Sequence, residues 1–315
     1  MVVFHHAINS KPWLFNPLEN YTALATGVDI FFVISGFIMY VAASNETPFE
    51  FLRKRIIRIV PLYWVATLAF VLVKTKLHVF SITTEDLLHI LKSLAFIPHE
   101  DPTNPGKFWP YLIQGWTLNY EMFFYLIFFV SLTIKNVIAF TSITILVLFA
   151  VGQFFGFQSA TAATCTSPLL LEYLIGIWLG ILYTKAKLNN LAWLIPVGFV
   201  GLLLSPLYST AYTNFGHLIF ASMIIAGAAS LGKNTPHSPL AKLLGNASYS
   251  IYLTHVIISL RLANTLFKMA PISGWLQFLS YVALSIFLST MIGVLIHLYV
   301  EKPMLGRLRK IWRSR

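Results

Sequence analysis

The chain has 315 residues, of which 57% are hydrophobic and 10% charged, and its mean hydropathy is +0.74. Soluble globular domains carry about 25% charged residues, so this composition excludes a soluble domain and predicts an all-α, polytopic bundle of transmembrane helices. The net charge of +11 does not indicate a nucleic-acid partner, because the basic residues follow the loops of one membrane face.

Apolar runs predict about ten membrane spans in chain order. The runs are a fragment at 1–9, then 27–44, 56–73, 116–134, 136–155, 168–185, 190–206, 215–232, 247–266 and 275–300. The fragment is too short to span, so we expect a truncated first helix. Residues 82–97 predict an amphipathic helix at the membrane interface. We expect one membrane domain over 1–303 and a basic cytoplasmic tail over 304–315.

The distribution of Lys and Arg predicts the orientation of the spans. With both termini in the cytoplasm, fifteen of the 22 basic residues fall on that side: Arg53, Lys54, Arg55, Arg58, Lys135, Lys185, Lys187, Lys233, Lys242, Lys302, Arg307, Arg309, Lys310, Arg313 and Arg315. The loops at 156–167 and 207–214 carry no charge and lie on the opposite face. The long connection at 74–115 is also expected outside.

Two adjacent histidines, His5 and His6, end the first apolar fragment. Histidine is the side chain best suited to accept a proton near neutral pH, so either residue is a candidate general base. The alternative is an interfacial histidine without a catalytic role. Adjacent histidines on a helix point about 100° apart, and no third ligand is near, so no metal site is predicted.

Small residues interrupt the second run at Ser35-Gly36-Phe37, after Phe31 and Phe32. Small residues let helices approach closely, which is one interpretation. The other is that the Ser35 hydroxyl and the thin backbone at Gly36 line a ligand channel.

Four cations occur within six residues at Arg53-Lys54-Arg55 and Arg58. One interpretation is a topology and lipid-headgroup cluster. The other uses the i, i+3 spacing of Arg55 and Arg58, which places two guanidinium groups on one helix face. Such a pair suits a polyphosphate such as that of coenzyme A.

An ionisable residue, Glu121, lies inside the apolar run that begins at Trp116. A carboxylate at this depth is costly unless it is paired or faces a polar cavity, so its default interpretation is functional. Further polar residues inside apolar runs are Glu172, Tyr252, His255 and His297, and interhelical hydrogen bonds are the alternative for each.

These segments, in this order, resemble the acyltransferase-3 family of membrane acyltransferases. Its members share a histidine near the end of helix one, then Phe-Phe-x-x-Ser-Gly-Phe, Arg-x-x-Arg-Ile-x-Pro, Trp-x-Leu-x-x-Glu-x-x-Phe-Tyr, Ser-Tyr-x-x-Tyr-Leu-x-His and a terminal Glu-Lys-Pro. All six patterns occur here between residues 5 and 303. The stretch at 115–125 is most similar to the branch that O-acetylates bacterial exopolysaccharides of the succinoglycan type.

The resemblance implies a donor, an acceptor and a place in the cell. Acetyl-CoA would donate from the cytoplasm, without a metal, and the acceptor would be a hydroxyl group of an exopolysaccharide or lipid-linked repeat unit near the outer face. The protein would lie in the bacterial inner membrane, in contact with its lipids. The sequence does not give the acceptor sugar or the oligomeric state.

The resemblance also implies roles for individual residues. His6 or His5 would be the base, and Glu121 would orient its imidazole. Arg55 and Arg58 would bind the CoA phosphates, and Ser35, Gly36 and Phe37 would line the path of the acyl-pantetheine arm. The acceptor would contact Trp116, Tyr125, Tyr252 and His255.

The sequence departs from the family pattern at one point, and two alternatives to an active enzyme stay open. The family carries an arginine in helix one, with ten residues between it and the histidine, and that position falls before Met1. The alternatives are a transporter or flippase of a lipid-linked sugar, which would use the same polar residues as a path, and a homologue that has lost activity.

Overall fold

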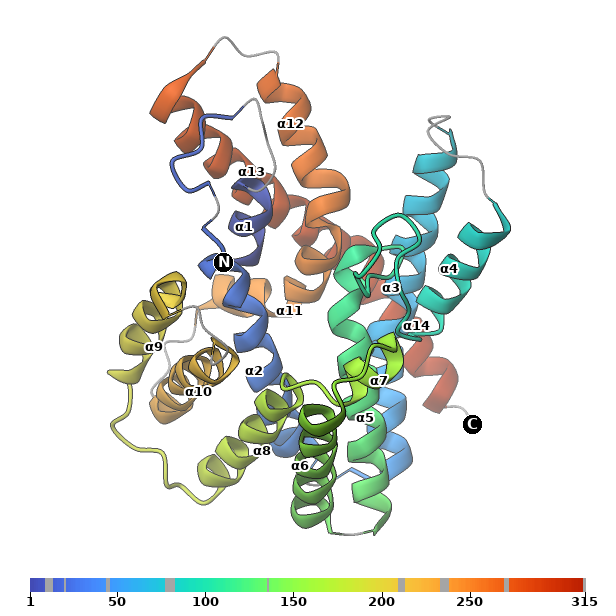
Figure 1. Cartoon of the computed structure of the whole chain (residues 1–315), viewed down its shortest axis with the longest axis vertical. Coiled ribbons are helices and arrows are strands. Elements are labelled where there is room, and N and C mark those ends of the chain that lie inside the picture. Colours follow the sequence, from blue (N-terminus) through green and yellow to red (C-terminus); the bar gives the residue numbers. More distant parts are fainter. Residues whose placement is uncertain are drawn as a thin grey trace. The chain divides into compact units, whose positions relative to one another are not determined.

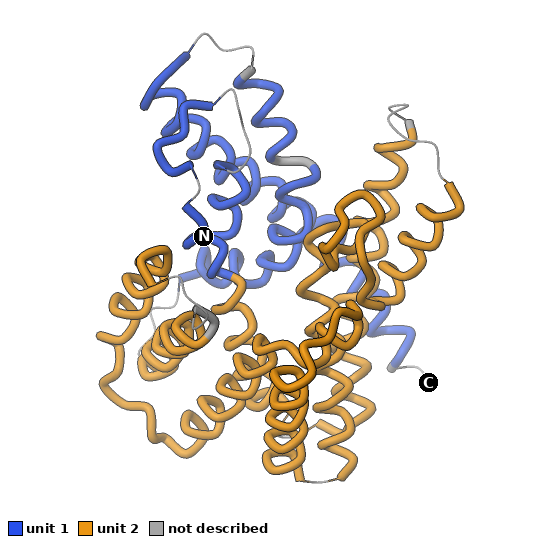
Figure 2. The backbone as a smooth tube through the Cα atoms, viewed as in Figure 1, with its two compact units in different colours: residues 1–27, 236–315 blue, residues 28–235 orange. Residues whose placement is uncertain are grey.

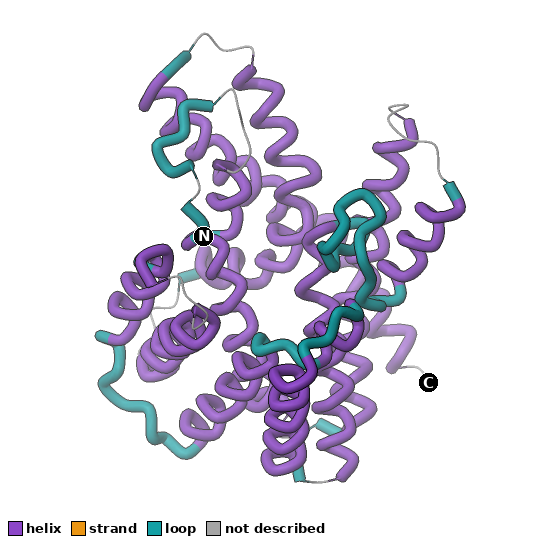
Figure 3. The backbone as a smooth tube through the Cα atoms, in the orientation of Figure 1, coloured by secondary structure: helices purple, strands orange, loops and turns teal. Residues whose placement is uncertain are grey.

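The computed structural model describes residues 1–8, 14–19, 21–43, 46–76, 83–134, 136–208, 213–232, 238–268 and 272–313. Within these ranges the regular elements are all helices, joined by loops (Figure 3). The predicted all-α membrane fold is therefore confirmed. The chain divides into two compact units, residues 1–27 with 236–315 (unit 1) and residues 28–235 (unit 2), which we describe separately (Figure 2).

Unit 2 contains most of the long apolar helices (Figure 1). They are α2 (Gly27–Ala43, of which Gly27 falls in unit 1), α3 (Pro48–Lys76), α4 (Thr84–Leu94), α5 (Trp116–Ile134), α6 (Val137–Phe155), α7 (Ala160–Cys165), α8 (Leu170–Thr184), α9 (Leu194–Leu203) and α10 (Thr213–Leu231). Short 3₁₀ turns at Ile113–Gly115 and Ser205–Tyr208 precede α5 and follow α9.

Unit 1 consists of the N-terminal segment of the chain and its C-terminal helices. Its helices are α1 (Val2–Ile8), a 3₁₀ turn (Ala23–Thr26), α11 (Pro239–Thr254), α12 (Leu260–Lys268), α13 (Gly274–Ile296) and α14 (Lys302–Arg313). Two π-helical turns, His255–Ser259 and His297–Glu301, connect α11 to α12 and α13 to α14. Each π turn begins at a histidine, His255 or His297, that lies inside one of the apolar runs of the sequence.

Six helices of the described residues are long and apolar enough to cross a membrane, and a seventh span results if the bent pair at Pro239–Ile257 and Leu260–Phe267 counts as one. The sequence predicted about ten. The difference arises from α1, which has 7 residues, and from the two shorter apolar helices at Leu194–Leu203 and Phe215–Leu231. The outward side of α6 is strongly apolar, with Phe154 84% exposed, as expected of a surface that meets lipid tails.

Two helix boundaries differ from the prediction for local reasons. Helix α3 begins at Pro48 rather than 56, because Thr47 and Glu50 form reciprocal hydrogen bonds that cap it. Helix α11 begins at Pro239 rather than 247, where the Ser238 hydroxyl accepts the backbone N–H of Ala241. The predicted basic tail is helical as α14.

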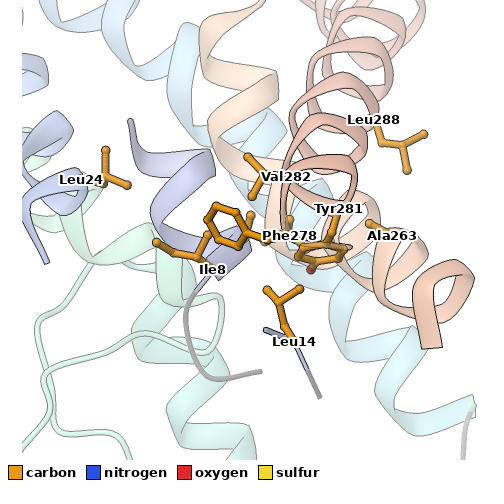
Figure 4. Close-up of a cluster of buried hydrophobic side chains, with 10 residues drawn as sticks. Ile8, Leu14, Leu24, Ala263, Phe278, Tyr281, Val282 and Leu288 are labelled. Carbon is orange, nitrogen blue, oxygen red and sulfur yellow. The ribbon is translucent and has the colours of Figure 1, made fainter. Parts of the chain in front are cut away.

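The core of unit 1 packs the N-terminal segment against α12 and α13 (Figure 4). Its buried side chains are Ala7, Ile8, Leu14, Leu24, Leu260, Ala263, Phe278, Tyr281, Val282 and Leu288. The Tyr281 hydroxyl, which would be costly to bury alone, donates to Asn264 Oδ1 at 2.7 Å. This packing holds the short α1, which carries His5 and His6, against a full-length helix.

Two glycines bring the backbones of α2 and α8 into contact in unit 2. A Cβ atom on Gly36 would lie 2.1 Å from the Tyr173 carbonyl oxygen, and one on Gly176 would lie 2.1 Å from the Val33 carbonyl oxygen. Both obstacles are backbone atoms, so no side-chain movement relieves them. The close-packing interpretation of Gly36 is therefore correct, whereas its predicted contact with a donor stays a prediction.

Replacing Gly36 by Ala is expected to lower the unfolding temperature in detergent, because the new methyl group forces α2 and α8 apart. Overpacking of this kind costs about 1–3 kcal/mol. Gly245→Ala is the matched control, since a Cβ on Gly245 of α11 meets no atom within 4 Å and helix propensity alone favours alanine. Equal unfolding temperatures for Gly36→Ala and the unmodified protein would contradict the close contact.

Candidate functional site

The histidines of α1 form a cluster with a third histidine in unit 1. The rings of His5 and His6 lie 5.3 Å apart between centroids, and the rings of His6 and His255 lie 5.2 Å apart. Nδ1 of His5 is buried without a hydrogen-bond partner among the described residues. Residues more than 240 positions apart in the sequence thus bring three imidazoles together.

The environment of His255 determines which of its nitrogens can accept a proton. His255 is fully buried, and its Nδ1 lies 2.6 Å from the Tyr252 carbonyl oxygen, which can only accept a hydrogen bond. Nδ1 therefore carries the hydrogen, and in the neutral ring Nε2 carries a lone pair. Nε2 is buried and has no partner within the described part of the chain. His255 thus offers an acceptor nitrogen in the same cluster as His6.

A second constellation in unit 2 surrounds Glu121 of α5. The Tyr125 hydroxyl donates a hydrogen bond to Glu121 Oε1, and both side chains are buried. The positive charges of Arg58 and Arg55, on α3, act on the Glu121 carboxyl group. Oε2 of Glu121 is buried without a partner among the described residues. Glu121 belongs to unit 2, so its predicted pairing with His5 or His6 stays a prediction.

The two arginines differ in exposure, although they share a helix face as predicted. The Arg55 guanidinium lies 5.3 Å from the Phe51 ring centroid, and its Nε is buried without a partner in the described structure. Arg58 is exposed. Both lie inside α3 rather than in the loop before it. The Nε–H group of Arg55 is therefore available to donate a hydrogen bond to a ligand, and the side chain of Arg58 is accessible from the surface of unit 2.

Aromatic side chains line the interior beside Glu121. Tyr173 is buried and stacks on Phe124 at 4.3 Å between centroids, and Phe32 lies 5.0 Å from Tyr173. Trp116, predicted to contact the acceptor, lies edge-on to Phe32 at 6.2 Å. Phe37, predicted to contact the donor, packs on Tyr183 at 5.5 Å, and Ser35 is buried. The structure thus places Trp116 against Phe32 of α2, and Phe37 of the same helix against Tyr183 of α8.

The sequence did not single out two residues that the structure places together with Glu172. Asp29 and His217 form an ion-pair contact, with His217 Nδ1 3.6 Å from Asp29 Oδ1, and Glu172 hydrogen-bonds to Asp29. A usable signal was present for Asp29, since it is an ionisable residue inside the apolar run at 27–44.

The terminal Glu-Lys-Pro motif has a clear packing role. Oε2 of Glu301 accepts a hydrogen bond from the Ser250 hydroxyl at 2.7 Å and lies 2.7 Å from His297 Nδ1. Glu301 thus ties α11 to the π turn that ends α13.

A hydrogen-bonded pair of histidines, His89 and His99, lies outside the membrane spans and connects α4 to the loop that follows it. His99 Nδ1 lies 2.7 Å from the Ile97 carbonyl oxygen and must donate to it, so His99 Nε2 accepts from His89 Nδ1 at 2.6 Å. Burial lowers the pKa of His89 to about 4 and also lowers the pKa of His99. Both imidazoles are therefore neutral at pH 7.

The histidine pair predicts a loss of stability in mild acid. Since the folded pKa of His89 lies below the ordinary value of 6.5, the unfolded chain binds more protons between pH 6.5 and about pH 4. The contribution of the neutral His89 ring to the free energy of unfolding is therefore complete above pH 6.5, and it declines as the pH falls from 6.5 to about 4. Unfolding temperatures measured from pH 7 to pH 4 should fall more steeply for the unmodified protein than for His89→Gln/His99→Gln, and equal slopes would contradict the assignment.

Comparison with known proteins gives two findings that concern nearly the whole chain. A family described as "Acyltransferase domain" matches residues 1–294. The exopolysaccharide production protein ExoZ of Rhizobium meliloti is 34% identical over 304 residues, which cover 93% of this chain and 94% of that protein. No solved structure matches.

Proposed function

Because this chain belongs to the acyltransferase-3 family of integral membrane proteins, we propose that it transfers an acetyl group from acetyl-CoA to a hydroxyl group of an exopolysaccharide or its lipid-linked repeat unit. The observation that carries this proposal is the histidine cluster of unit 1, where His5, His6 and His255 meet and two buried ring nitrogens have no partner among the described residues. Unpartnered buried imidazole nitrogens suit a proton acceptor.

The proposed reaction needs a base at the acceptor and cations at the donor. A sugar hydroxyl ionises far above pH 7, so His6 or His5 accepts its proton while the oxygen attacks the thioester carbonyl carbon. The carbon–oxygen bond forms, the carbon–sulfur bond breaks, and the CoA sulfur takes up a proton. Arg55 and Arg58 bind the CoA phosphates, for which two guanidinium groups on one helix face are suited.

The choice of a carbohydrate acceptor draws support from the name of the relative ExoZ. ExoZ is named for exopolysaccharide production, and its likeness to this chain extends over almost all of both proteins. A transporter of a lipid-linked sugar is the alternative, because ionisable residues inside spans also mark substrate paths. The acyltransferase domain match favours the enzyme.

Transfer of radiolabelled acetyl groups separates these functions. The purified protein in lipid nanodiscs is incubated with [¹⁴C]acetyl-CoA and polysaccharide from a strain in which this gene is deleted. Label in the polymer that mild alkali releases as acetate is the expected result, since O-esters are alkali-labile. Movement of lipid-linked sugar across proteoliposomes without labelling would instead support a transporter.

We also propose the orientation with a cytoplasmic C-terminus in the bacterial inner membrane, on the distribution of Lys and Arg. Alkaline phosphatase fused after Arg315 should be inactive in intact cells, and a green fluorescent protein fused there should fluoresce. The same phosphatase inserted in the charge-free connection at 156–159 should be active. The reverse pattern would overturn the orientation.

A further inference from the structure

Three ionisable side chains of unit 2 meet at the N-terminal ends of three helices. Asp29 is the third residue of α2, Glu172 the third of α8 and His217 the fifth of α10. Glu172 hydrogen-bonds to Asp29, and His217 Nδ1 lies 3.6 Å from Asp29 Oδ1. Helix N-termini carry partial positive charge, which favours the two carboxyl groups at these positions.

The cluster has more hydrogen-bonding capacity than the protein uses. Glu172 is 1% exposed, yet its Oε2 has no partner among the described residues, and the same is true of His217 Nε2. Buried polar atoms in folded proteins nearly always have a partner, and the cost of leaving one unsatisfied rises in a low-dielectric interior. Two such atoms in one cluster indicate that a polar ligand supplies the missing hydrogen bonds.

The composition of the cluster restricts the chemistry of that ligand. The cluster contains two carboxyl groups and one imidazole, so hydrogen-bond acceptors predominate and an anion such as phosphate, which also only accepts, is disfavoured. No group of three His, Cys, Asp or Glu suited to a metal ion occurs in the described parts of the chain. A neutral polyol fits, because a hydroxyl group can donate a hydrogen bond to a carboxyl oxygen and accept one from an imidazole N–H group.

An aromatic ring beside the cluster adds a second feature of carbohydrate sites. The Tyr208 ring lies 6.4 Å from the His217 ring, and its hydroxyl donates to the Gly201 carbonyl oxygen at 3.0 Å, which fixes the ring in place. The apolar face of a fixed ring suits the C–H face of a sugar.

We infer that Asp29, Glu172 and His217 form a binding subsite for adjacent hydroxyl groups of the acceptor carbohydrate. This inference rests on the proposed function. In the proposed orientation, α2, α8 and α10 all begin on the extracytoplasmic side, where such an acceptor arrives. The three residues are positioning residues that hold the sugar and do not take part in acyl transfer.

Two measurements on Glu172→Gln and Asp29→Asn test the subsite. The first is the Kd of deacetylated oligosaccharide, prepared from the deletion-strain polymer and measured by equilibrium dialysis against protein in nanodiscs. The second is the pair of KM values for the polymer and for acetyl-CoA. Each variant should raise the oligosaccharide Kd and the polymer KM by about 10- to 100-fold, because a hydrogen bond to a charged group is lost. The acetyl-CoA KM should change by less than about twofold.

The matched control is Glu85→Ala, an exposed carboxylate in the first turn of α4 in the same unit. Its Kd and both KM values should equal those of the unmodified protein. Unfolding temperatures and acetyl-CoA binding check that each variant is folded. If Glu172→Gln or Asp29→Asn does not fold, His217→Gln takes its place, because glutamine keeps hydrogen-bonding groups and removes the titratable ring. Unchanged oligosaccharide affinity in folded variants overturns the inference. Oligosaccharide binding that depends on Glu172 without acetyl transfer supports the subsite and overturns the proposed enzyme.

Discussion

Replacing both His5 and His6 by alanine should lower kcat for acetyl transfer by about 10²–10⁴-fold, the usual contribution of a positioned general base. The physical reason is that no other group of α1 can take the proton of the sugar hydroxyl. Initial rates of labelled acetyl transfer measure the effect, and binding of acetyl-CoA should survive. Of the single variants, His6→Ala should be the more damaging, because the His6 ring lies 5.2 Å from the ring of His255 and so belongs to the centre of the histidine cluster.

The outcomes distinguish a catalytic role from a structural one. Unfolding temperatures of the histidine variants should stay close to that of the unmodified protein, since the packing of α1 rests on Ala7 and Ile8. A double variant that acetylates polymer at near the parent rate would show that the base is elsewhere, and Glu121 would then be tested first. A large effect of His5→Ala with a mild effect of His6→Ala would exchange their roles.

Alanine at Arg55 or Arg58 should raise the KM for acetyl-CoA by about 10- to 150-fold and change the KM for the polymer much less. The reason is that a charge-assisted contact to a phosphate contributes roughly 1.5–3 kcal/mol. Arg55→Lys should recover only part of the affinity, because an ammonium group lacks the planar pair of donors.

The neighbouring lysine provides the charge-matched control. Lys54 lies on α3 between Arg53 and Arg55, and its ammonium group already pairs with Glu46 at 2.8 Å. Lys54→Ala removes one positive charge at the same helix end and should leave the KM for acetyl-CoA unchanged. If Lys54→Ala weakens donor binding as much as the arginine variants, a general electrostatic effect is responsible and the specific contact is excluded.

The sequence predicted the fold class and most helices because lipid exposure leaves a simple signal, a run of apolar residues of bilayer length. The boundaries it missed depend on capping rather than on hydropathy. Thr47-Pro48-x-Glu50 is a capping box with proline at the first helical position, and Ser238-Pro239 is a second start signal. Both lie outside the apolar runs, so a prediction based on those runs starts each helix late.

The sequence predicted which site residues lie together only where those residues belong to the same helix. Arg55 and Arg58 share a face through local spacing, and Glu121 with Tyr125 is likewise an i, i+4 pair. The meeting of His6 with His255, and of Asp29 with Glu172 and His217, depends on tertiary packing between distant helices. The spacing of residues within one helix does not indicate contacts of this kind between helices. The π turns at His255–Ser259 and His297–Glu301 were also beyond prediction, because a change in the backbone hydrogen-bond pattern leaves no signal in the hydropathy of the chain.

If unit 2 binds the acyl donor as proposed, the glycine crossing of α2 and α8 restricts the route that the acyl chain takes. At Gly36 and Gly176 the two backbones touch, so the seam between these helices is closed to a pantetheine arm. Ser35 precedes Gly36 by one residue and therefore points about 100° away from that seam. A donor that reaches the Ser35 hydroxyl must approach α2 from a side that α8 does not cover. In the proposed enzyme the crossing is thus a fixed wall of the acyl route, and the opposite flank of α2 is the surface to probe with thioester-bearing cross-linkers.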